Sequence, residues 1–231
     1  EGSLGRLDTD YIDLLMIHWP NRSVPLAETL EAMESLKRSG KVRAIGVCNF
    51  GVRDLADALA LVDIAADQLP YSLLFRAIEY DVLPACLRHE VPVMAYSPLA
   101  QGLLTGKFSS AADVDDERAR TRFYSKHRPG TVHDEEGYEQ DVFEALAQLE
   151  TLCRTLNISM SHAAISWVLQ QNGVCAALVG ARTPEQVRDN ARYVQSGLDT
   201  EALCQLGNVT AALKAAMGAN PDMWQGDSRV M

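Results

Sequence analysis

The run YIDLLMIHWP, residues 11–20, bears most directly on the fold. It is almost wholly apolar and does not alternate between apolar and polar residues, which is typical of a β-strand buried on both faces. It ends on an imidazole, an indole and a proline, whereas most buried strands run into a turn of Gly, Asn or Asp. We therefore predict a strand over residues 11–19, with His18 and Trp19 at its carboxyl end.

Similar strands recur along the chain and alternate with helical segments. The further strands are predicted over residues 42–48, 65–69, 91–96 and 175–179. Helices are predicted over residues 25–39, 53–62, 78–89, 138–156, 161–171 and 200–216, and a further helix is predicted to begin at Thr183. Pro84 should interrupt the helix over residues 78–89, and residues 2–7 have the pattern of a helix tail. Residues 109–137 are polar with few apolar anchors and predict a partly mobile loop or lid, and residues 218–231 predict an irregular tail.

Apolar strands that alternate with helices predict a parallel sheet covered by helices. Five such units allow two architectures, an open doubly wound sheet or the later part of an eight-stranded barrel. A doubly wound dinucleotide fold usually carries G-x-G-x-x-G after its first strand, and this sequence has none. The run GLLTGKF, residues 102–108, has three residues between its glycines and Phe after Lys, so it does not match a P-loop.

The composition narrows the class of protein. Apolar residues make up 47% of the 231 residues and charged residues 23%, as in an ordinary globular domain. The net charge of −10 argues against nucleic acid as the main partner, and no apolar run is long enough to insert in a membrane. Five widely spaced cysteines without a CxxC pair argue against a disulfide framework or a zinc site and favour a reducing compartment.

Polar or aromatic residues lie at the carboxyl end of each of the five predicted strands. They are, in chain order, His18 and Trp19, Cys48 and Asn49, Gln68, Tyr96 and Ser97, and the run Gly180, Ala181 and Arg182. Any one of them fits a turn, a helix cap or the edge of a core. In a β/α barrel, however, the carboxyl ends of the strands converge on one mouth that holds the active site. The five together predict such a site.

The order and spacing of these motifs resemble the aldo-keto reductase family, which are (β/α)8 TIM barrels that use NADPH. The matching segments are residues 7–14 running into His18-Trp19-Pro20, residues 46–50, Gln68 with residues 71–74, residues 96–107, and residues 180–182 with Gln186 and Asn190. Residues 96–107 are most similar to the branch that includes potassium-channel β-subunits, general-stress reductases and pyridoxal reductases. The resemblance implies one α/β barrel domain over residues 1–231, incomplete at its N-terminus, of which the chain supplies about the last five β/α units.

The resemblance also implies a binding site for NADP(H). It places Cys48, Asn49 and Gln68 at the nicotinamide carboxamide and Tyr96 on the nicotinamide ring. The pyrophosphate would be bound by Ser97, Pro98, Leu99, Ala100, Gln101 and Lys107. Arg182 would contact the 2′-phosphate, Gln186 and Asn190 would contact the adenine, and Gly180 and Asp189 are among the remaining cofactor contacts. Arg182 would favour NADP(H) over NAD(H). No metal site is implied. Cys48 stands where the family more often has Ser, and we consider whether its oxidation would affect cofactor binding.

By resemblance, His18 is catalytic, orienting the carbonyl group of a small substrate, and Trp19 forms a wall of the substrate pocket. The catalytic Asp, Tyr and Lys of the family precede the His strand, so this interpretation places them outside the chain and the chain in the C-terminal two thirds of its parent. We expect the parent protein to reduce an aldehyde or ketone in the cytoplasm or the plastid stroma, as a monomer or an oligomer, and the chain alone to be inactive. The alternatives are a cofactor-binding regulatory subunit or an inactive truncated paralogue.

Overall fold

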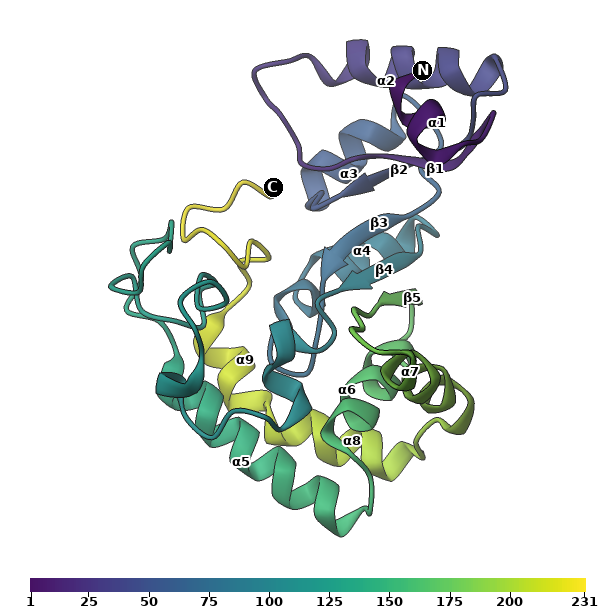
Figure 1. The fold of residues 1–231 in the computed structure, drawn as a ribbon. Coiled ribbons are helices and arrows are strands. Elements are labelled where there is room, and N and C mark those ends of the chain that lie inside the picture. Colours follow the sequence, from purple (N-terminus) through teal and green to yellow (C-terminus); the bar gives the residue numbers. More distant parts are fainter.

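The computed structural model describes residues 1–231 and contains one parallel sheet (Figure 1). Its strands are β1 (Ile12–Ile17), β2 (Val42–Cys48), β3 (Asp67–Pro70), β4 (Val93–Tyr96) and β5 (Val174–Leu178). They are hydrogen-bonded in the order β1-β2-β3-β4-β5, and every neighbouring pair is parallel. Because the strand order follows the chain without reversal, the sheet has no switch point. The sheet is therefore an arc of a (β/α)8 barrel and not a doubly wound sheet.

Helices connect the strands and lie along the outside of the arc (Figure 1). They are α1 (Gly2–Leu7), α2 (Leu26–Arg38), α3 (Val52–Leu59), α4 (Val82–Arg88), α5 (Glu139–Thr155), α6 (Met160–Leu169), α7 (Pro184–Ser196), α8 (Thr200–Val209) and α9 (Ala211–Met217), with short 3₁₀ helices η1 (Ala77–Glu79), η2 (Ala100–Thr105) and η3 (Ala111–Asp113). The predicted strands and most of the predicted helices are confirmed with shifts of a few residues at their ends. None of the helices is both long and apolar enough to cross a bilayer.

Two predicted helices are each divided in two. The helix predicted over residues 78–89 becomes η1 and α4, and Pro84 lies in the first turn of α4, where no backbone N–H is needed for the helix. The single helix predicted over residues 200–216 is wrong, because it breaks at Thr210 between α8 and α9. The Thr210 hydroxyl accepts a hydrogen bond from Arg76 Nη1 at 3.1 Å, so a tertiary contact accompanies this break.

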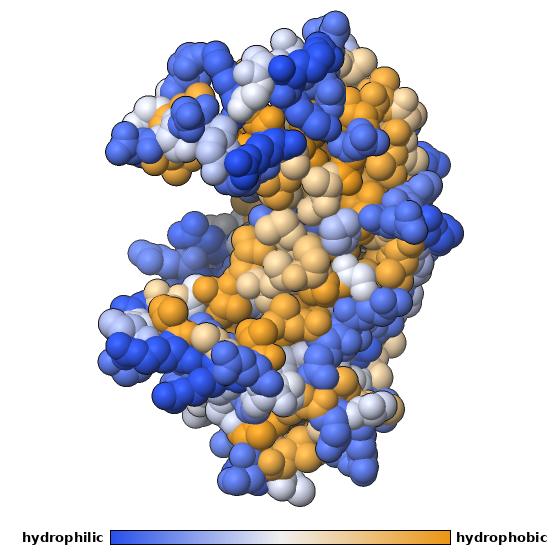
Figure 2. All heavy atoms as spheres, turned by 90° about the vertical axis from the view of Figure 1, so that its right-hand side faces the viewer, coloured by the Kyte–Doolittle hydropathy of each residue, from blue (hydrophilic) through white to orange (hydrophobic).

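The prediction that all five strands are buried on both faces is wrong for the two outer strands. β2, β3 and β4 carry most of the buried strand residues, whereas β1 and β5 contain none that is fully buried. An outer strand has a hydrogen-bonded neighbour on one side only, so its other side stays open. Figure 2 shows apolar residues gathered in a band that runs down one face of the molecule, with hydrophilic residues along its sides.

Residues 109–137 form a loop with one 3₁₀ turn, as predicted, but the prediction of few apolar anchors is wrong. Val114, Ala119, Phe123 and Tyr124 are buried, and Phe123 packs edge-on against Phe75 at 6.1 Å between ring centroids. A few large side chains thus fix a segment whose composition is mostly polar. The tail over residues 218–231 is irregular, as predicted. It returns from α9 towards α3, where the chain ends in Figure 1.

A partly buried ionic cluster ties η1 to the C-terminal helices. The Glu79 carboxylate accepts hydrogen bonds from Arg76 at 2.7 and 2.9 Å, from Lys214 Nζ at 2.7 Å and from the Tyr71 hydroxyl at 2.8 Å. Burial by itself would raise the pKa of Glu79, but these donors outweigh burial and hold the pKa below its ordinary value. The cluster therefore stabilises the fold only while Glu79 is ionised.

We expect Glu79→Gln to lower the free energy of unfolding by about 3 kcal/mol at pH 7, because it leaves Arg76 and Lys214 without their anion. The lowered pKa gives the sign of the pH dependence. The stabilisation is present above the ordinary pKa of 4.5 and is lost as the pH falls through the folded-state pKa. Urea unfolding of the natural protein that contains this chain measures both effects. The exposed Glu185→Gln is the matched control, and an equal loss in the two variants at pH 7 would contradict the prediction.

Candidate active site

A cavity of about 510 Å³ lies at the carboxyl ends of the first four strands. Its lining consists of His18, Trp19, Cys48, Asn49, Gln68, Tyr96, Val132, Trp224 and Arg229. The first six are predicted site residues that come from four different strand ends. The other three come from the loop over residues 109–137 and from the irregular tail. The cavity thus collects the residues that the sequence places at one mouth of the barrel.

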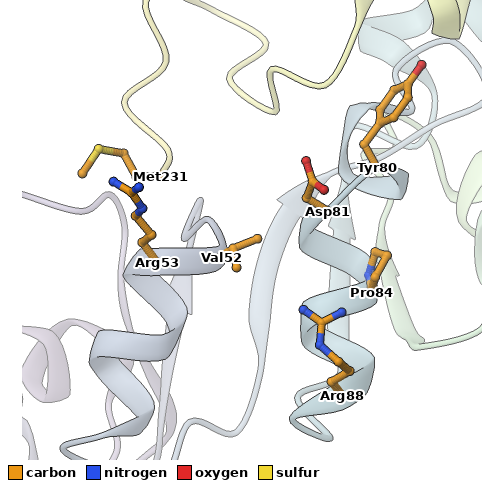
Figure 3. Close-up of a pocket in the computed structure, with 7 residues that line it drawn as sticks. All are labelled: Val52, Arg53, Tyr80, Asp81, Pro84, Arg88 and Met231. Carbon is orange, nitrogen blue, oxygen red and sulfur yellow. The ribbon is translucent and has the colours of Figure 1, made fainter.

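Another cavity, of about 380 Å³, lies between α3 and α4 (Figure 3). The residues around it include Arg53 and Arg88 on the two helices and Met231 at the end of the tail. None of the predicted site residues lines it. We therefore take the cavity at the strand ends as the candidate active site.

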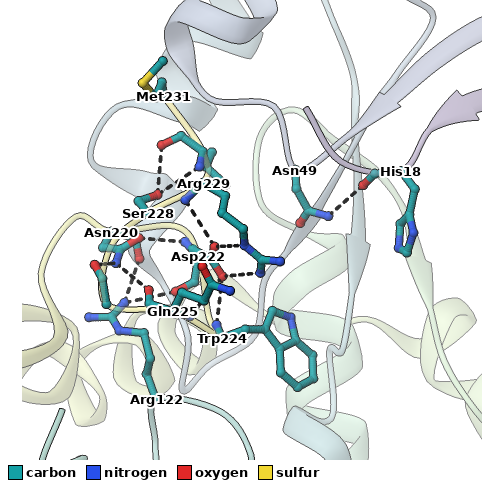
Figure 4. A network of polar contacts seen from close by, with 12 residues as sticks. His18, Asn49, Arg122, Asn220, Asp222, Trp224, Gln225, Ser228, Arg229 and Met231 are labelled. Carbon is teal, nitrogen blue, oxygen red and sulfur yellow. Dashed lines mark hydrogen bonds and ion pairs between the residues drawn. The ribbon is translucent and has the colours of Figure 1, made fainter. Parts of the chain in front are cut away.

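The amide of Asn49 joins three strand ends in the candidate site. Its Nδ2 donates to the carbonyl oxygen of His18 at 3.1 Å, and its Oδ1 accepts from the Tyr96 hydroxyl at 2.9 Å (Figure 4 shows the His18 contact). A main-chain carbonyl can only accept, so this contact fixes which side of the amide is nitrogen. His18 lies in the bend just after β1, and its ring centroid is 6.4 Å from that of Trp19. Asn49 therefore holds the backbone of His18 in place.

Backbone strain is concentrated at the same strand ends. Asn49 directly follows β2 with φ of 60°, and Ser97 directly follows β4 with φ of 54°. Ala100 and Gln101 in η2 also have positive φ, at 46° and 56°. Residues with side chains adopt this left-handed region rarely and at a cost of about 1–3 kcal/mol each. Four such residues after the ends of β2 and β4 indicate a functional constraint on this part of the chain.

The side chains of Asn49 and Gln68 offer complementary hydrogen-bonding groups. Both hydrogens of Asn49 Nδ2 have partners, the His18 carbonyl oxygen and Cys48 Sγ at 3.2 Å, while Oδ1 keeps one free lone pair. Gln68 Nε2 makes only a weak contact of 3.8 Å to Met16 Sδ, so its N–H groups are open. Together they present an acceptor and a donor. A primary carboxamide such as that of nicotinamide requires this pair.

Two other lining groups have raised pKa values. Burial, with a smaller contribution from the nearby Asp67, raises the pKa of Cys48 to about 12. The Cys48 thiol contacts Gln68 Oε1 at 3.6 Å and remains protonated at neutral pH. Burial also raises the pKa of Tyr96, whose hydroxyl is held by Asn49. Cys48 is therefore a poor target for oxidants, and Tyr96 is a poor proton donor.

The predicted pyrophosphate residues lie outside this cavity, directly after β4. Ser97, Pro98 and Leu99 form the turn that leads into η2, and Ala100 and Gln101 are the first two residues of η2. The Lys107 ammonium packs back over Gly102 and lies 4.5 Å from the centroid of the Phe108 ring. Partial desolvation, followed by the charges of Arg118 and Arg182, lowers the pKa of Lys107. Arg118 thus contributes to the same positive field as two predicted cofactor residues, and the sequence analysis missed it.

The predicted residues around α7 form a separate group. Thr183 caps α7 by accepting from Gln186 N, and the Gln186 side chain accepts from Arg182 N at 2.7 Å, so its carbonyl already has a structural partner. Asp189 is paired with Arg192 at 3.1 Å. Asn190 lines a different, apolar cavity of about 320 Å³ between α6, β5 and α7. Gly180 lies in the link between β5 and α7. The structure does not bring this group into the cavity with His18.

Trp224 and Arg229 are two of the three lining residues that sequence reasoning missed, the third being Val132 in the loop over residues 109–137. Trp224 and Arg229 lie in the tail that was predicted only to be irregular, yet they reach the cavity because the chain returns to the strand ends. The available signal was a large aromatic residue and an arginine in a segment with no helical or strand pattern. Such residues need a partner elsewhere in the fold.

Comparisons with known proteins bear on the family and the fold. The model of the aldo/keto reductase family matches residues 1–210. The chain is 37% identical over 188 residues to aldo-keto reductase YhdN of Bacillus subtilis, covering 81% of this chain and 54% of that protein. It is 33% identical over 215 residues to the NADH-specific methylglyoxal reductase of Escherichia coli, covering 92% and 63%. The structure of glycerol dehydrogenase AKR11B4 from Gluconobacter oxydans matches with a TM-score of 0.74 and 32% identity, covering 91% and 62%.

The family match extends over most of the chain, and the (β/α)8 fold is shared with solved members. The protein therefore belongs to the aldo/keto reductase family. The chain spans 54% and 63% of the length of these two relatives.

We expect Cys48 to react with iodoacetamide at neutral pH at least ~100-fold more slowly than Cys204, because burial keeps its thiol protonated. Cys204 is exposed on α8 and serves as the internal control. Peptide mapping by mass spectrometry over a time course measures both rates in one sample. Equal rates would show that Cys48 is accessible and ionised, and would revive the idea that its oxidation regulates the site.

Proposed function

We propose that the natural protein containing this chain reduces a small aldehyde or ketone to an alcohol, with NADPH as the reductant. The observation that carries the proposal is the single cavity that unites His18, Trp19, Asn49, Gln68 and Tyr96 at four strand ends. The strained backbone after β2 and β4 supports it. The relative that is named a methylglyoxal reductase supports carbonyl reduction as the reaction class.

Residues of this chain fit the nicotinamide part of the cofactor. Asn49 Oδ1 would accept from the carboxamide nitrogen, and Gln68 Nε2 would donate to its oxygen. Tyr96 would pack on one face of the ring and leave the other face to the substrate. When bound, the reduced cofactor supplies a hydride to the carbonyl carbon. Residues 97–101 and Lys107 would bind the pyrophosphate through backbone N–H groups and one positive charge.

His18 would orient the substrate. An imidazole N–H at the end of an apolar strand can donate to the carbonyl oxygen, and this bond strengthens as negative charge develops there. Trp19 would form the wall of the pocket beside it. The oxygen also takes up a proton, and we place its donor outside the nine lining residues. Tyr96 is excluded as the donor because its hydroxyl is held by Asn49 and its pKa is raised.

The preference for NADPH rests on the positive charges near the predicted cofactor path. Arg182 precedes α7, and its guanidinium can bind a phosphate through two N–H groups. Lys107 lies in the field of Arg182 and Arg118. Gln186, Asp189, Asn190 and Gly180 would complete the adenosine end. Since one relative is named NADH-specific, the choice of cofactor needs its own test.

We expect His18→Ala in the natural protein to lower kcat for carbonyl reduction by about 100-fold, through loss of a hydrogen bond made in the transition state. The affinity for NADPH should change little, because His18 contacts the substrate and not the cofactor. Steady-state kinetics and fluorescence titration with NADPH measure the two quantities, with His89→Ala as the surface control. A large loss of NADPH binding would contradict this role. A wild-type protein that binds NADPH and reduces no carbonyl would favour a regulatory subunit instead.

We expect Arg182→Gln to raise the KM for NADPH by about 10-fold or more and to leave the KM for NADH nearly unchanged, because only NADPH carries the 2′-phosphate. Arg188→Gln is the control, since Arg188 is exposed on α7 and paired with Glu185. The measurement is the ratio of kcat/KM for the two cofactors in each variant. A change of the same size for both cofactors would show that Arg182 does not read the 2′-phosphate.

A further inference from the structure

The cavity at the strand ends has a charge character opposite to that of the whole chain. The chain contains 31 acidic residues against 21 Lys and Arg. The nine residues that line the cavity include no Asp or Glu, and Arg229 is the one Lys or Arg among them. A lone guanidinium in the wall of an otherwise neutral and aromatic pocket offers a partner for a negatively charged group.

Arg229 is held in a fixed orientation by a buried carboxylate. Its Nε and Nη2 donate to the two oxygens of Asp222 at 2.7 and 3.0 Å (Figure 4). Asp222 is fully buried behind Arg229 and also accepts from the backbone N–H groups of Trp224, Gln225 and Arg229. This set of donors fixes the position of the carboxylate. The guanidinium is therefore pre-organised before any ligand binds.

The remaining side of the guanidinium lies next to the predicted substrate residues. Its central carbon is 3.7 Å from the centroid of the Trp19 ring, and that ring is 6.4 Å from the His18 ring. Arg229 Nη1 makes no hydrogen bond within the protein, although its two N–H groups are available. About a third of the Arg229 side chain is exposed. One small molecule in the cavity can therefore reach both the His18 ring and Arg229 Nη1.

The tail that carries Arg229 is anchored on both sides of this residue. On one side Asn220 donates to the carbonyl oxygens of Gln225 and Gly226 at 3.0 and 2.8 Å. On the other side Met231 N donates to Asp54 Oδ2 at 2.8 Å. Arg22 links the backbone of Arg229 to α3, since it donates to the Arg229 carbonyl oxygen and to Asp54, each at 2.8 Å. These contacts fix the backbone of Arg229 relative to β1 and α3.

We propose that Arg229 binds a carboxylate on the substrate, so that the preferred substrates are carbonyl compounds that also carry a carboxylate. A monoanion fits better than a phosphate dianion, because Asp222 already balances most of the positive charge and leaves one pair of N–H donors. This inference rests on the proposed carbonyl reduction for its kinetic test. Binding of the anion itself is independent of that reaction.

The kinetic test compares two aromatic aldehydes of similar shape, 4-carboxybenzaldehyde and methyl 4-formylbenzoate, with the natural protein and NADPH. Wild type should have the higher kcat/KM for the carboxylate. In Arg229→Gln the ratio of the two kcat/KM values should fall by about 10-fold or more, mainly through a higher KM for the acid, since a charged hydrogen bond is lost. Arg229→Lys should keep part of the preference. Arg38→Gln, at the exposed end of α2, should keep the wild-type ratio.

A binding test uses benzoate, followed by the fluorescence change of the tryptophans in the site, and needs no turnover. Wild type should bind benzoate more tightly than benzamide, and Arg229→Gln should lose this difference.

If Arg229 only holds the tail in place, its variant should weaken both aldehydes equally. Equal weakening of both aldehydes would overturn the proposal. So would a wild type that prefers neither 4-carboxybenzaldehyde over its methyl ester nor benzoate over benzamide. If benzoate binds through Arg229 but neither aldehyde is reduced, the proposed reaction fails and the anion site stands. If Arg229→Gln does not fold, the wild-type comparison and Arg229→Lys decide.

Discussion

The hydrogen bonds of one amide, Asn49, determine the arrangement of the candidate site. Asn49 connects the backbone after β1 with the side chain at the end of β4, although two strands separate β1 from β4 in the sheet. To do so it adopts a left-handed backbone conformation, which Asn tolerates better than most residues because its short polar side chain can bond locally. The same contacts leave Oδ1 with one acceptor position and leave Gln68 with its donors. The geometry for a carboxamide thus follows from how the strand ends are held together.

The curvature of the sheet makes this contact possible. Adjacent strands lie about 4.8 Å apart, so β2 and β4 are separated by about 10 Å, and side chains on a flat sheet stand roughly parallel. Asn49 and Tyr96 meet at 2.9 Å, which fits a sheet that bends so that both side chains point to its inner side. The arc therefore forms the mouth of the site locally, between neighbouring and next-neighbouring strands. The open sides of β1 and β5 do not enter these contacts.

Much of the fold could be predicted from the sequence because its signals are local. A mostly apolar run located β2 with the correct bounds, and Thr183 followed by Pro184 and Gln186 located the start of α7. The errors arose where tertiary contacts decide. Thr210 lies at a helix break where it contacts Arg76, and Phe123 is buried against Phe75 although its neighbours are polar. The site residues of the first four strands were found for the same local reason, since each lies in or just after a recognisable strand. Their roles at a bound cofactor remain predictions.

The tail shows why the remaining part of the site could not be predicted. Asp222 and Arg229 are seven residues apart in a segment without periodicity, and nothing in the sequence pairs them. Their pairing depends on Arg122 as well, because Arg122 from the loop donates to the carbonyl oxygens of Asn220 and Asp222 at 3.1 and 3.3 Å while it is paired with Glu135 at 2.9 Å. The loop thus fixes the tail, and the tail fixes the cation beside Trp19. The strand ends provide the groups suited to a nicotinamide and a carbonyl, whereas two irregular segments provide the charge that would distinguish one carbonyl compound from another.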